Sequence, residues 1–202
     1  MNSRSDEQTT RYYQLHADEY VRKTVGLDVS DLYAEFLAHV PAEGLILDAG
    51  CGSGRDSQAF LDRGFRVTSI DAVQAMVEAT TKLTGQPARR MRLQAVDFPC
   101  EFDGIWACAS LLHVPWDELP ETLRRLARTL RMEGVLFASF KYGHGERIEA
   151  ARLFTDLDEN RAASLLAQVP ELRLLKLWRS GDYLEREVTW LNLLLRKEQC
   201  TT

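Results

Sequence analysis

The sequence predicts an α/β protein with a seven-stranded, mostly parallel, doubly wound sheet whose last strand runs antiparallel. Two observations lead to this prediction. Short apolar runs alternate with amphipathic segments along most of the chain, a pattern typical of parallel sheets covered by helices on both faces. The last two runs are separated by the short turn sequence Ser180-Gly181-Asp182. A parallel pair needs a crossover of a dozen or more residues, so strand seven must run antiparallel to strand six.

The individual elements follow from local pattern. Apolar side chains recur at helical spacing over 11–40, and Ser30 or Asp31 is the expected cap of the second helix in this stretch. A short apolar run at 45–47 then leads to Asp48 and a cluster of glycines. Further strands are expected at 65–70, 89–96, 102–109, 135–140, 172–178 and 188–195, and helices at 55–63, 73–83, 119–130 and 155–169, the last with Asp158 as its cap.

Composition removes several classes of function. The 202 residues are 45% hydrophobic and 27% charged, which is ordinary for a globular protein and fits one domain with some residues to spare. The net charge of −5 argues against a protein that binds nucleic acid mainly through phosphates. The polar start and the lack of a long apolar run predict neither a signal peptide nor a membrane span, so a cytoplasmic protein is expected. The four cysteines have no metal-ligand spacing, so no metal site is expected.

The most informative segment is the loop from Asp48 to Arg55, with the sequence DAGCGSGR, which follows the first predicted strand. Glycines allow positive φ angles and let a ligand approach the main chain. The helix that follows offers free N–H groups and the positive end of its dipole. Because α/β sheets bind ligands beyond the carboxyl ends of their strands, a ligand is expected at this loop.

Two kinds of ligand compete for such a loop. A dinucleotide needs the pattern GxGxxG, but here Gly50, Gly52 and Gly54 are evenly spaced. The carboxylate of Asp48 lies two residues before the first of these glycines, where it would repel a pyrophosphate. It would instead attract a cationic group such as an aminium or a sulfonium. The sign of this charge argues against a nicotinamide dinucleotide.

Acidic residues also end the next two predicted strands. Asp71 ends the second strand, at a spacing from the glycine loop that suits hydrogen bonds to the two hydroxyls of a ribose. Asp97 and Phe98 end the third strand and offer a carboxylate and a flat apolar surface for an adenine. Three acidic strand ends in succession therefore predict a pocket for a positively charged nucleoside.

With these residues in place, the sequence resembles the class I S-adenosylmethionine-dependent methyltransferases. The similarity is greatest to the small bacterial type-11 group, through the strings LDAGCGSGRD and FDGIWACASLLHV, and it extends from about Tyr12 to Lys197. The resemblance implies a Rossmann-like fold with seven strands and a reversed last strand. It also implies S-adenosyl-L-methionine as cofactor and S-adenosyl-L-homocysteine as product.

The resemblance further implies which residues contact the cofactor. Asp48 would lie near the methionine amino group, Asp71 would hold the ribose, and Tyr20 would contact the methionine end. Taken alone, Asp48 or Asp71 could equally be a cap, and Met76 could be a core residue. The other implied contacts are the methionine-binding loop of Gly50, Cys51, Gly52 and Gly54, the adenine neighbours Ala72, Met76, Asp97 and Phe98, and the main chain at Ala109 beside the sulfonium.

The loop after the fourth strand bears on the methyl acceptor. It lacks the Asn/Asp-Pro-Pro-Tyr motif with which some enzymes methylate the exocyclic amines of DNA, so DNA is not expected as a partner. His113 in this loop is the candidate catalytic residue, because a neutral imidazole could take a proton from an acceptor hydroxyl or amine. The alternative is that His113 orders the loop by hydrogen bonding.

The expected organisation is a single methyltransferase domain over 1–202. Residues 1–44 would form a helical cover, 45–141 the cofactor-binding core, and 142–202 a lid segment with the acceptor-side half of the chain. The expected reaction is in-line transfer of a methyl group to an O, N or S atom of a small molecule. A tRNA or protein acceptor, a regulator that binds the cofactor without turnover, and a nicotinamide-dependent oxidoreductase remain as alternatives.

Overall fold

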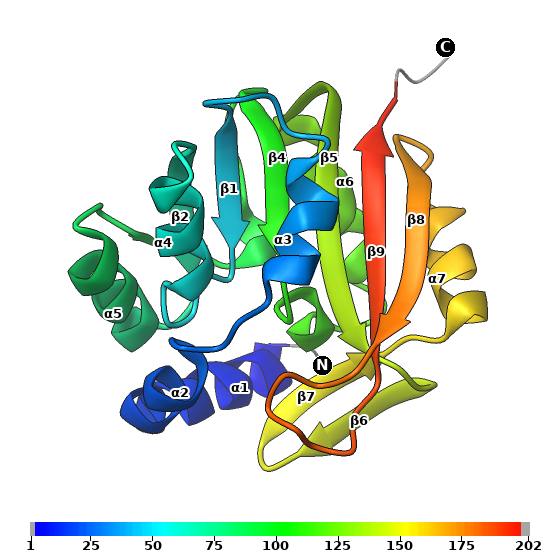
Figure 1. Ribbon diagram of the computed structural model, residues 1–202. Coiled ribbons are helices and arrows are strands. Elements are labelled where there is room, and N and C mark those ends of the chain that lie inside the picture. Colours follow the sequence, from blue (N-terminus) through cyan, green and yellow to red (C-terminus); the bar gives the residue numbers. More distant parts are fainter. Residues whose placement is uncertain (1–2, 199–202) are drawn as a thin grey trace.

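A central sheet of seven strands organises the molecule, with helices on both of its faces (Figure 1). The computed structural model describes residues 3–198. The strand order is β3-β2-β1-β4-β5-β9-β8. The strands are β1 (Leu45–Ala49), β2 (Arg66–Asp71), β3 (Arg89–Arg90), β4 (Phe102–Ala107), β5 (Leu130–Lys141), β8 (Leu172–Ser180) and β9 (Trp190–Lys197).

Strand direction confirms the predicted fold class. The pairs from β3 through β5 are all parallel, whereas β9 runs antiparallel to both β5 and β8. The last strand is therefore the reversed one, inserted between β5 and β8 (Figure 1). The linker before it is longer than the turn that the sequence suggested, since it occupies 181–189.

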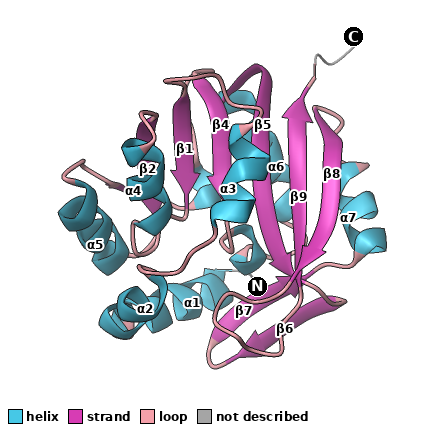
Figure 2. Ribbon diagram, in the orientation of Figure 1, coloured by secondary structure: helices cyan, strands magenta, loops and turns pink. Residues whose placement is uncertain are grey.

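Seven helices belong to the described part of the chain, and Figure 2 separates them from the strands. Asp158 caps the last of them, because its side chain accepts a hydrogen bond from the Arg161 main-chain N–H at 2.8 Å. None of the helices in the described residues is long and apolar enough to cross a membrane. The helices are α1 (Ser3–Leu15), α2 (Ala17–Thr24), α3 (Ser30–Leu37), α4 (Arg55–Asp62), α5 (Gln74–Thr84), α6 (Leu119–Thr129) and α7 (Glu159–Leu166).

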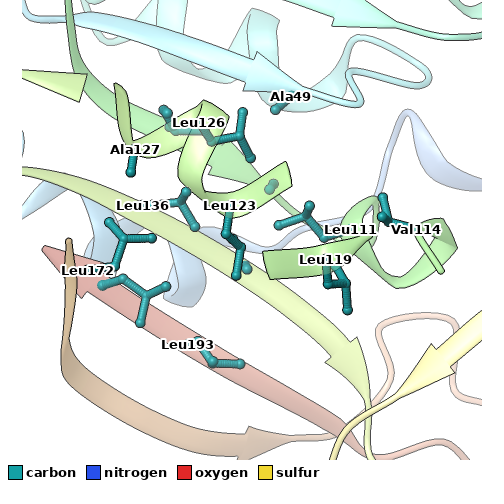
Figure 3. Close-up of a cluster of buried hydrophobic side chains, with 14 of the residues drawn as sticks. Ala49, Leu111, Val114, Leu119, Leu123, Leu126, Ala127, Leu136, Leu172 and Leu193 are labelled. Carbon is teal, nitrogen blue, oxygen red and sulfur yellow. The ribbon is translucent and has the colours of Figure 1, made fainter. Parts of the chain in front are cut away.

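The core is divided between the two faces of the sheet. On one face, Leu123 and Leu126 of α6 pack over the sheet beside Leu136 of β5 (Figure 3). On the other face, aromatic rings from α3, α4, β4 and β5 dominate, and the rings of Trp106 and Phe137 stack with centroids 4.2 Å apart. Both layers hold the strands rigidly, so the loops at their carboxyl ends have a fixed base.

The prediction of a strand at 89–96 is largely wrong. Only Arg89 and Arg90 pair with β2, and the chain then forms a 3-10 turn, η1 (Leu93–Ala95). The alternation of Met91, Leu93 and Ala95 had suggested a strand. This segment lies at the edge of the sheet, and a 3-10 turn also packs Met91 and Leu93 against the core.

The segment after β5 also differs from the expectation. Strands β6 (Gly145–Glu149) and β7 (Arg152–Asp156) form an antiparallel hairpin, so the helix predicted from residue 155 begins only at Glu159. The connection is the pair Ala150 and Ala151, both with positive φ, as a two-residue turn of the primed type requires. The hairpin extends beneath the sheet beside α1 (Figure 1), where the Leu153 N–H donates to Thr9 Oγ1 at 3.0 Å.

Candidate functional site

Two adjoining cavities lie at the carboxyl ends of the central strands. One has a volume of about 340 Å³ and the other about 100 Å³. Helices α1 and α2 lie across this end of the sheet, and the β6–β7 hairpin borders the larger cavity (Figure 1). The two cavities share six of their lining residues, and we call these the common wall: Tyr13, Tyr20, Gly50, Gly52, Ala109 and His113.

The glycine loop forms the base of this common wall. Gly50 has a φ of +95°, and a Cβ atom on it would lie 2.4 Å from the Cβ of Ser110. The main-chain N–H groups of Gly50 and Cys51 both donate to the Ile70 carbonyl, at 2.9 Å each, which fixes the loop on β2. Gly54, at +81°, is the residue before α4 and packs against Thr80. Only glycine satisfies both the backbone angle and the close contact at residue 50.

Asp48 is buried beneath the glycine loop and lines neither cavity. Its carboxylate accepts a hydrogen bond from Ser57 Oγ at 2.6 Å, and Ser57 Oγ lies 2.8 Å from Ser69 Oγ. Burial, together with the nearby Asp56 carboxylate, raises the pKa of Asp48. The raised pKa favours the protonated form of Asp48, so the charge argument made from the sequence stays a prediction: it requires a positive ligand above the loop to favour the ionised form.

Asp71, at the end of β2, lines the smaller cavity with Ala72 and Met76. Its two oxygens accept main-chain hydrogen bonds, one from Gly52 at 3.0 Å and the other from Val73 at 2.8 Å. Burial raises the pKa of Asp71 to about 6. Each carboxylate oxygen keeps further lone-pair capacity, so Asp71 is held rigidly and can still accept from a pair of ligand hydroxyls.

Asp97 and Phe98 lie away from both cavities. Asp97 is exposed, and the Phe98 ring packs edge-to-face on Phe102 at 5.4 Å. Leu93 and Gln94 of η1 line the smaller cavity instead, because the chain turns away from the sheet directly after Arg90. The role that the sequence suggested for Asp97 and Phe98 stays a prediction that the cavity geometry does not support.

Two tyrosines of the helical cover close the wall from above. The Tyr20 ring lies over Gly52, within 3.2 Å of the position that a Cβ atom would occupy there. Tyr13 contacts Tyr20 edge-to-face at 5.3 Å, and its hydroxyl lies 2.9 Å from Nε2 of His113. The sequence placed a tyrosine of this region at the site but did not indicate that Tyr13 would meet His113, which is 100 residues away.

His113 has both ring nitrogens engaged. Nδ1 lies 2.6 Å from the Leu153 carbonyl, which can only accept, so Nδ1 carries the proton. Nε2 therefore accepts the hydrogen bond from the Tyr13 hydroxyl. Burial lowers the pKa of His113 to about 4, which keeps the ring neutral. Before His113 could take a proton from an acceptor, the Tyr13 hydroxyl would have to leave Nε2.

Ala109, in the turn after β4, has a φ of +52°, an unusual backbone angle for a residue with a Cβ atom. Its N–H donates to Ser139 Oγ at 2.8 Å, and the next residue, Ser110, donates through Oγ to the Ala49 carbonyl at 2.6 Å. These bonds hold the strained turn against β1 and β5. Strain of this kind is common where a loop must present its main chain to a ligand.

A further network was not indicated by the sequence. Asp56, in the first turn of α4, accepts hydrogen bonds from the Tyr33 hydroxyl and from Trp106 Nε1, the latter at 2.8 Å. Arg55 binds both oxygens of the same carboxylate, at 2.6 and 2.9 Å. Arg55 and Asp56 line the larger cavity, and the network connects α3, α4 and β4 behind the glycine loop.

No cluster of three metal-ligating side chains occurs among the residues that the structure describes, although Cys200 lies outside them.

Of the residues that the sequence predicted at the site, only some line the cavities. They are Tyr20, Gly50, Cys51, Gly52, Asp71, Ala72, Met76, Ala109 and His113, with Asp48 and Gly54 in direct support of the loop.

Part of the sequence is similar to known methyltransferases. A family model described as a methyltransferase domain matches residues 46–134. Malonyl-[acyl-carrier protein] O-methyltransferase of Enterobacter lignolyticus is 33% identical over 62% of this chain and 47% of its own length. The enzyme of that name from Salmonella typhimurium is 29% identical over 72% of this chain and 58% of its own length. The chain thus spans about half the length of the curated relatives it matches.

A solved structure extends the similarity to almost the whole chain. The 1,6-didemethyltoxoflavin-N1-methyltransferase of Burkholderia thailandensis, determined with 1,6-didemethyltoxoflavin and S-adenosylhomocysteine bound, has a TM-score of 0.79. The similarity covers 96% of this chain and 88% of that one at 24% identity, so it concerns the fold. Residues 46–134 are therefore similar to a methyltransferase domain, and almost the whole chain has the fold of this solved structure.

Proposed function

We propose that the chain binds S-adenosylmethionine across the common wall and transfers its methyl group to a small molecule in the larger cavity. The observation that carries this proposal is the sharing of one wall by two cavities. A ligand that fills the smaller cavity extends along the glycine loop and presents its end to the larger one. The volume of about 340 Å³ suits a small acceptor.

The residues present fit this cofactor. Asp71 keeps acceptor capacity for two ribose hydroxyls, and Ala72 and Met76 offer apolar surface to an adenine. The main chain of the glycine loop and the ring of Tyr20 would hold the methionine part, above the buried carboxylate of Asp48. Once bound, the cofactor supplies a methyl group already activated by a sulfonium.

The protein's own contribution is positioning. The cover helices in 1–44 close the smaller cavity, the core in 45–141 carries the glycine loop, and 142–202 contributes the acceptor side. Ala109 and Tyr13 stand between the two cavities, where the methyl group must pass. Tyr13 is oriented by its hydrogen bond to His113, which we assign as a positioning residue. Alignment of this kind can supply several kcal/mol of the barrier.

Substitution of Asp71 tests the cofactor site. We expect Asp71→Asn to weaken binding of S-adenosylhomocysteine at least tenfold, about 1.4 kcal/mol, because an amide offers a ribose one fewer oxygen acceptor. Isothermal titration calorimetry measures the affinity, and thermal unfolding confirms that the variant is folded. Asp62→Asn, at an exposed position of α4, is the matched control. Equal affinity of Asp71→Asn and the control would contradict the ribose assignment.

A further inference from the structure

The larger cavity has an uneven balance of charged side chains. Five of its lining residues are lysines or arginines and four are acids. Among the acids, Asp182 and Asp56 each bind an arginine closely. The cations are Lys23, Arg55, Lys141, Arg152 and Arg186, and the acids are Glu19, Asp56, Glu149 and Asp182.

Each acid has a cationic partner in the same wall. Lys23 Nζ lies 2.6 Å from Glu19, and Arg186 lies 2.7 Å from Asp182. Arg55 holds Asp56 with the bidentate contact described above. Lys141 Nζ lies 3.7 Å from Glu149. The four acids are therefore matched by four cations, which leaves Arg152 as the fifth.

Arg152 forms no ion pair with an acid in the described part of the chain. Its cross-strand neighbour Glu149 is already engaged by Lys141 and by Arg147. The Arg152 guanidinium instead lies among aromatic rings, 4.4 Å from the centroid of Tyr12 and 5.1 Å from that of Phe154. Its Nε is buried and has no hydrogen-bond partner.

Lys141 strengthens the positive potential of this wall. Its Nζ lies 3.9 Å from the centroid of the Phe154 ring, which the Arg152 guanidinium also approaches, at 5.1 Å. Glu149 lies 3.7 Å from Lys141 and is shared with Arg147, and Arg147 also binds Asp156, the other acid that acts on Lys141. Apart from the Tyr13 hydroxyl, to which it can donate, the Arg152 guanidinium meets aromatic faces, which attract cations but offer no oxygen that can take its hydrogen bonds. The hairpin wall thus presents one cation, Arg152, that has no acid of its own among the lining residues.

The same cavity holds no free base beside the common wall. Both nitrogens of His113 are engaged, and the lining acids are ion-paired. Burial raises the pKa of Cys108 to about 12, so its thiol stays protonated. The remaining imidazole, His16, is exposed and stacks on Tyr12. His16 is not part of the common wall, so an acceptor held at that wall that must lose a proton, such as an alcohol, would find no free base beside it.

We propose that the methyl acceptor is a small monocarboxylate whose charge Arg152 neutralises, and that the product is its methyl ester. This inference rests on the proposed methyltransferase function. A carboxylate is ionised at neutral pH without a base, whereas a phenol or a thiol is mostly protonated. The single negative charge of a carboxylate also matches the single positive charge of Arg152, and the planar carboxylate group can accept two parallel hydrogen bonds from a guanidinium.

The reaction then balances without proton transfer. One carboxylate oxygen accepts from Arg152 while the other attacks the methyl carbon. The new bond joins oxygen to that carbon, the bond from sulfur to carbon breaks, and its electron pair remains on sulfur. The products are a neutral methyl ester and S-adenosylhomocysteine. Loss of the negative charge on esterification weakens the contact with Arg152 and favours release of the ester.

Three probes of one shape test the charge preference: benzoate, benzamide and benzylammonium. Their binding to the protein saturated with S-adenosylhomocysteine is measured by ligand-observed NMR. We expect benzoate to bind at least tenfold more tightly than benzamide, and benzylammonium to bind most weakly. Arg152→Gln should remove the preference for benzoate, and Arg152→Lys should restore part of it. Arg128→Gln, an exposed arginine on α6, is the control and should keep the full preference.

The outcomes separate the two proposals. If S-adenosylhomocysteine fails to bind to the unaltered protein in calorimetry, the proposed function itself is wrong. If it binds equally to the unaltered protein and to Arg152→Gln, but benzamide or benzylammonium matches benzoate, only the carboxylate inference is overturned. A benzoate affinity that Arg152→Gln leaves unchanged overturns it as well. With a labelled methyl donor and a metabolite extract, label released as methanol by mild alkali supports an ester product, and alkali-stable label contradicts it.

Discussion

The neutral, doubly hydrogen-bonded state of His113 predicts a specific loss of stability in acid. Its pKa is about 4 in the folded protein and about 6.5 in the unfolded chain. Because the unfolded chain binds the proton more tightly, the stability contributed above pH 6.5 is lost as the pH falls towards 4. Linkage between these two pKa values gives a loss of about 2 kcal/mol at pH 5 and about 3 kcal/mol at pH 4.

Urea unfolding of the unaltered protein and of His113→Gln at pH 7 and pH 5 measures this loss. The burial that raises the pKa of Asp71 acts in the opposite direction, but it is present in both proteins and cancels in their difference. With a denaturant slope of about 2 kcal/mol per molar, the unaltered protein should lose about 1 M more of its midpoint than the variant. Equal shifts in the two proteins would show that His113 is not held neutral by burial.

Two further predictions concern the architecture of the site. Gly50→Ala should lower the unfolding free energy by about 3 kcal/mol, because its Cβ would clash at 2.4 Å on a backbone at φ +95°. Gly64→Ala, at +84° with no atom within 4 Å, should lower it by only about 1 kcal/mol, and equal losses in urea unfolding would refute the steric argument. Trp106→Phe removes the donor to Asp56 and should destabilise the fold by about 2 kcal/mol. A loss below about 0.5 kcal/mol in thermal unfolding would mean that another donor, such as water, replaces the indole N–H.

Features governed by local pattern were predicted well from the sequence. The alternation of strands and helices predicted the seven-stranded sheet and its reversed last strand correctly. Helices and strands bury one face with different spacings of apolar residues, so each type of element can be recognised from its own segment. The cap at Asp158 was correct, whereas the cap expected at Ser30 or Asp31 is wrong, because Val29 precedes α3 and no side chain caps that helix. The glycine loop was found because its backbone angles restrict the residue type.

The remaining features depend on contacts that no local pattern encodes. The β6–β7 hairpin is short, and only β7 is buried whereas β6 is charged and largely exposed, so its sequence also fits a loop followed by a helix. The hydrogen bond between Tyr13 and His113 joins residues 100 positions apart. That Arg152 has no acid of its own becomes visible only when every lining acid has been paired in space. The cofactor contacts inferred from the resemblance remain predictions, and the geometry supports Asp71 better than Asp97.

The contact between the hairpin and the first helix also fixes when the site can form during synthesis. The bond from Leu153 to Thr9 connects residues separated by 144 positions, so Thr9 emerges from the ribosome long before its partner exists. At translation speeds of about 5–20 residues per second, the interval is on the order of ten seconds. Until the hairpin appears, His113 lacks its carbonyl partner and the cover helices lack their anchor. A nascent chain can thus assemble the glycine loop and β4 early, yet it becomes a competent binder only after the hairpin has been synthesised.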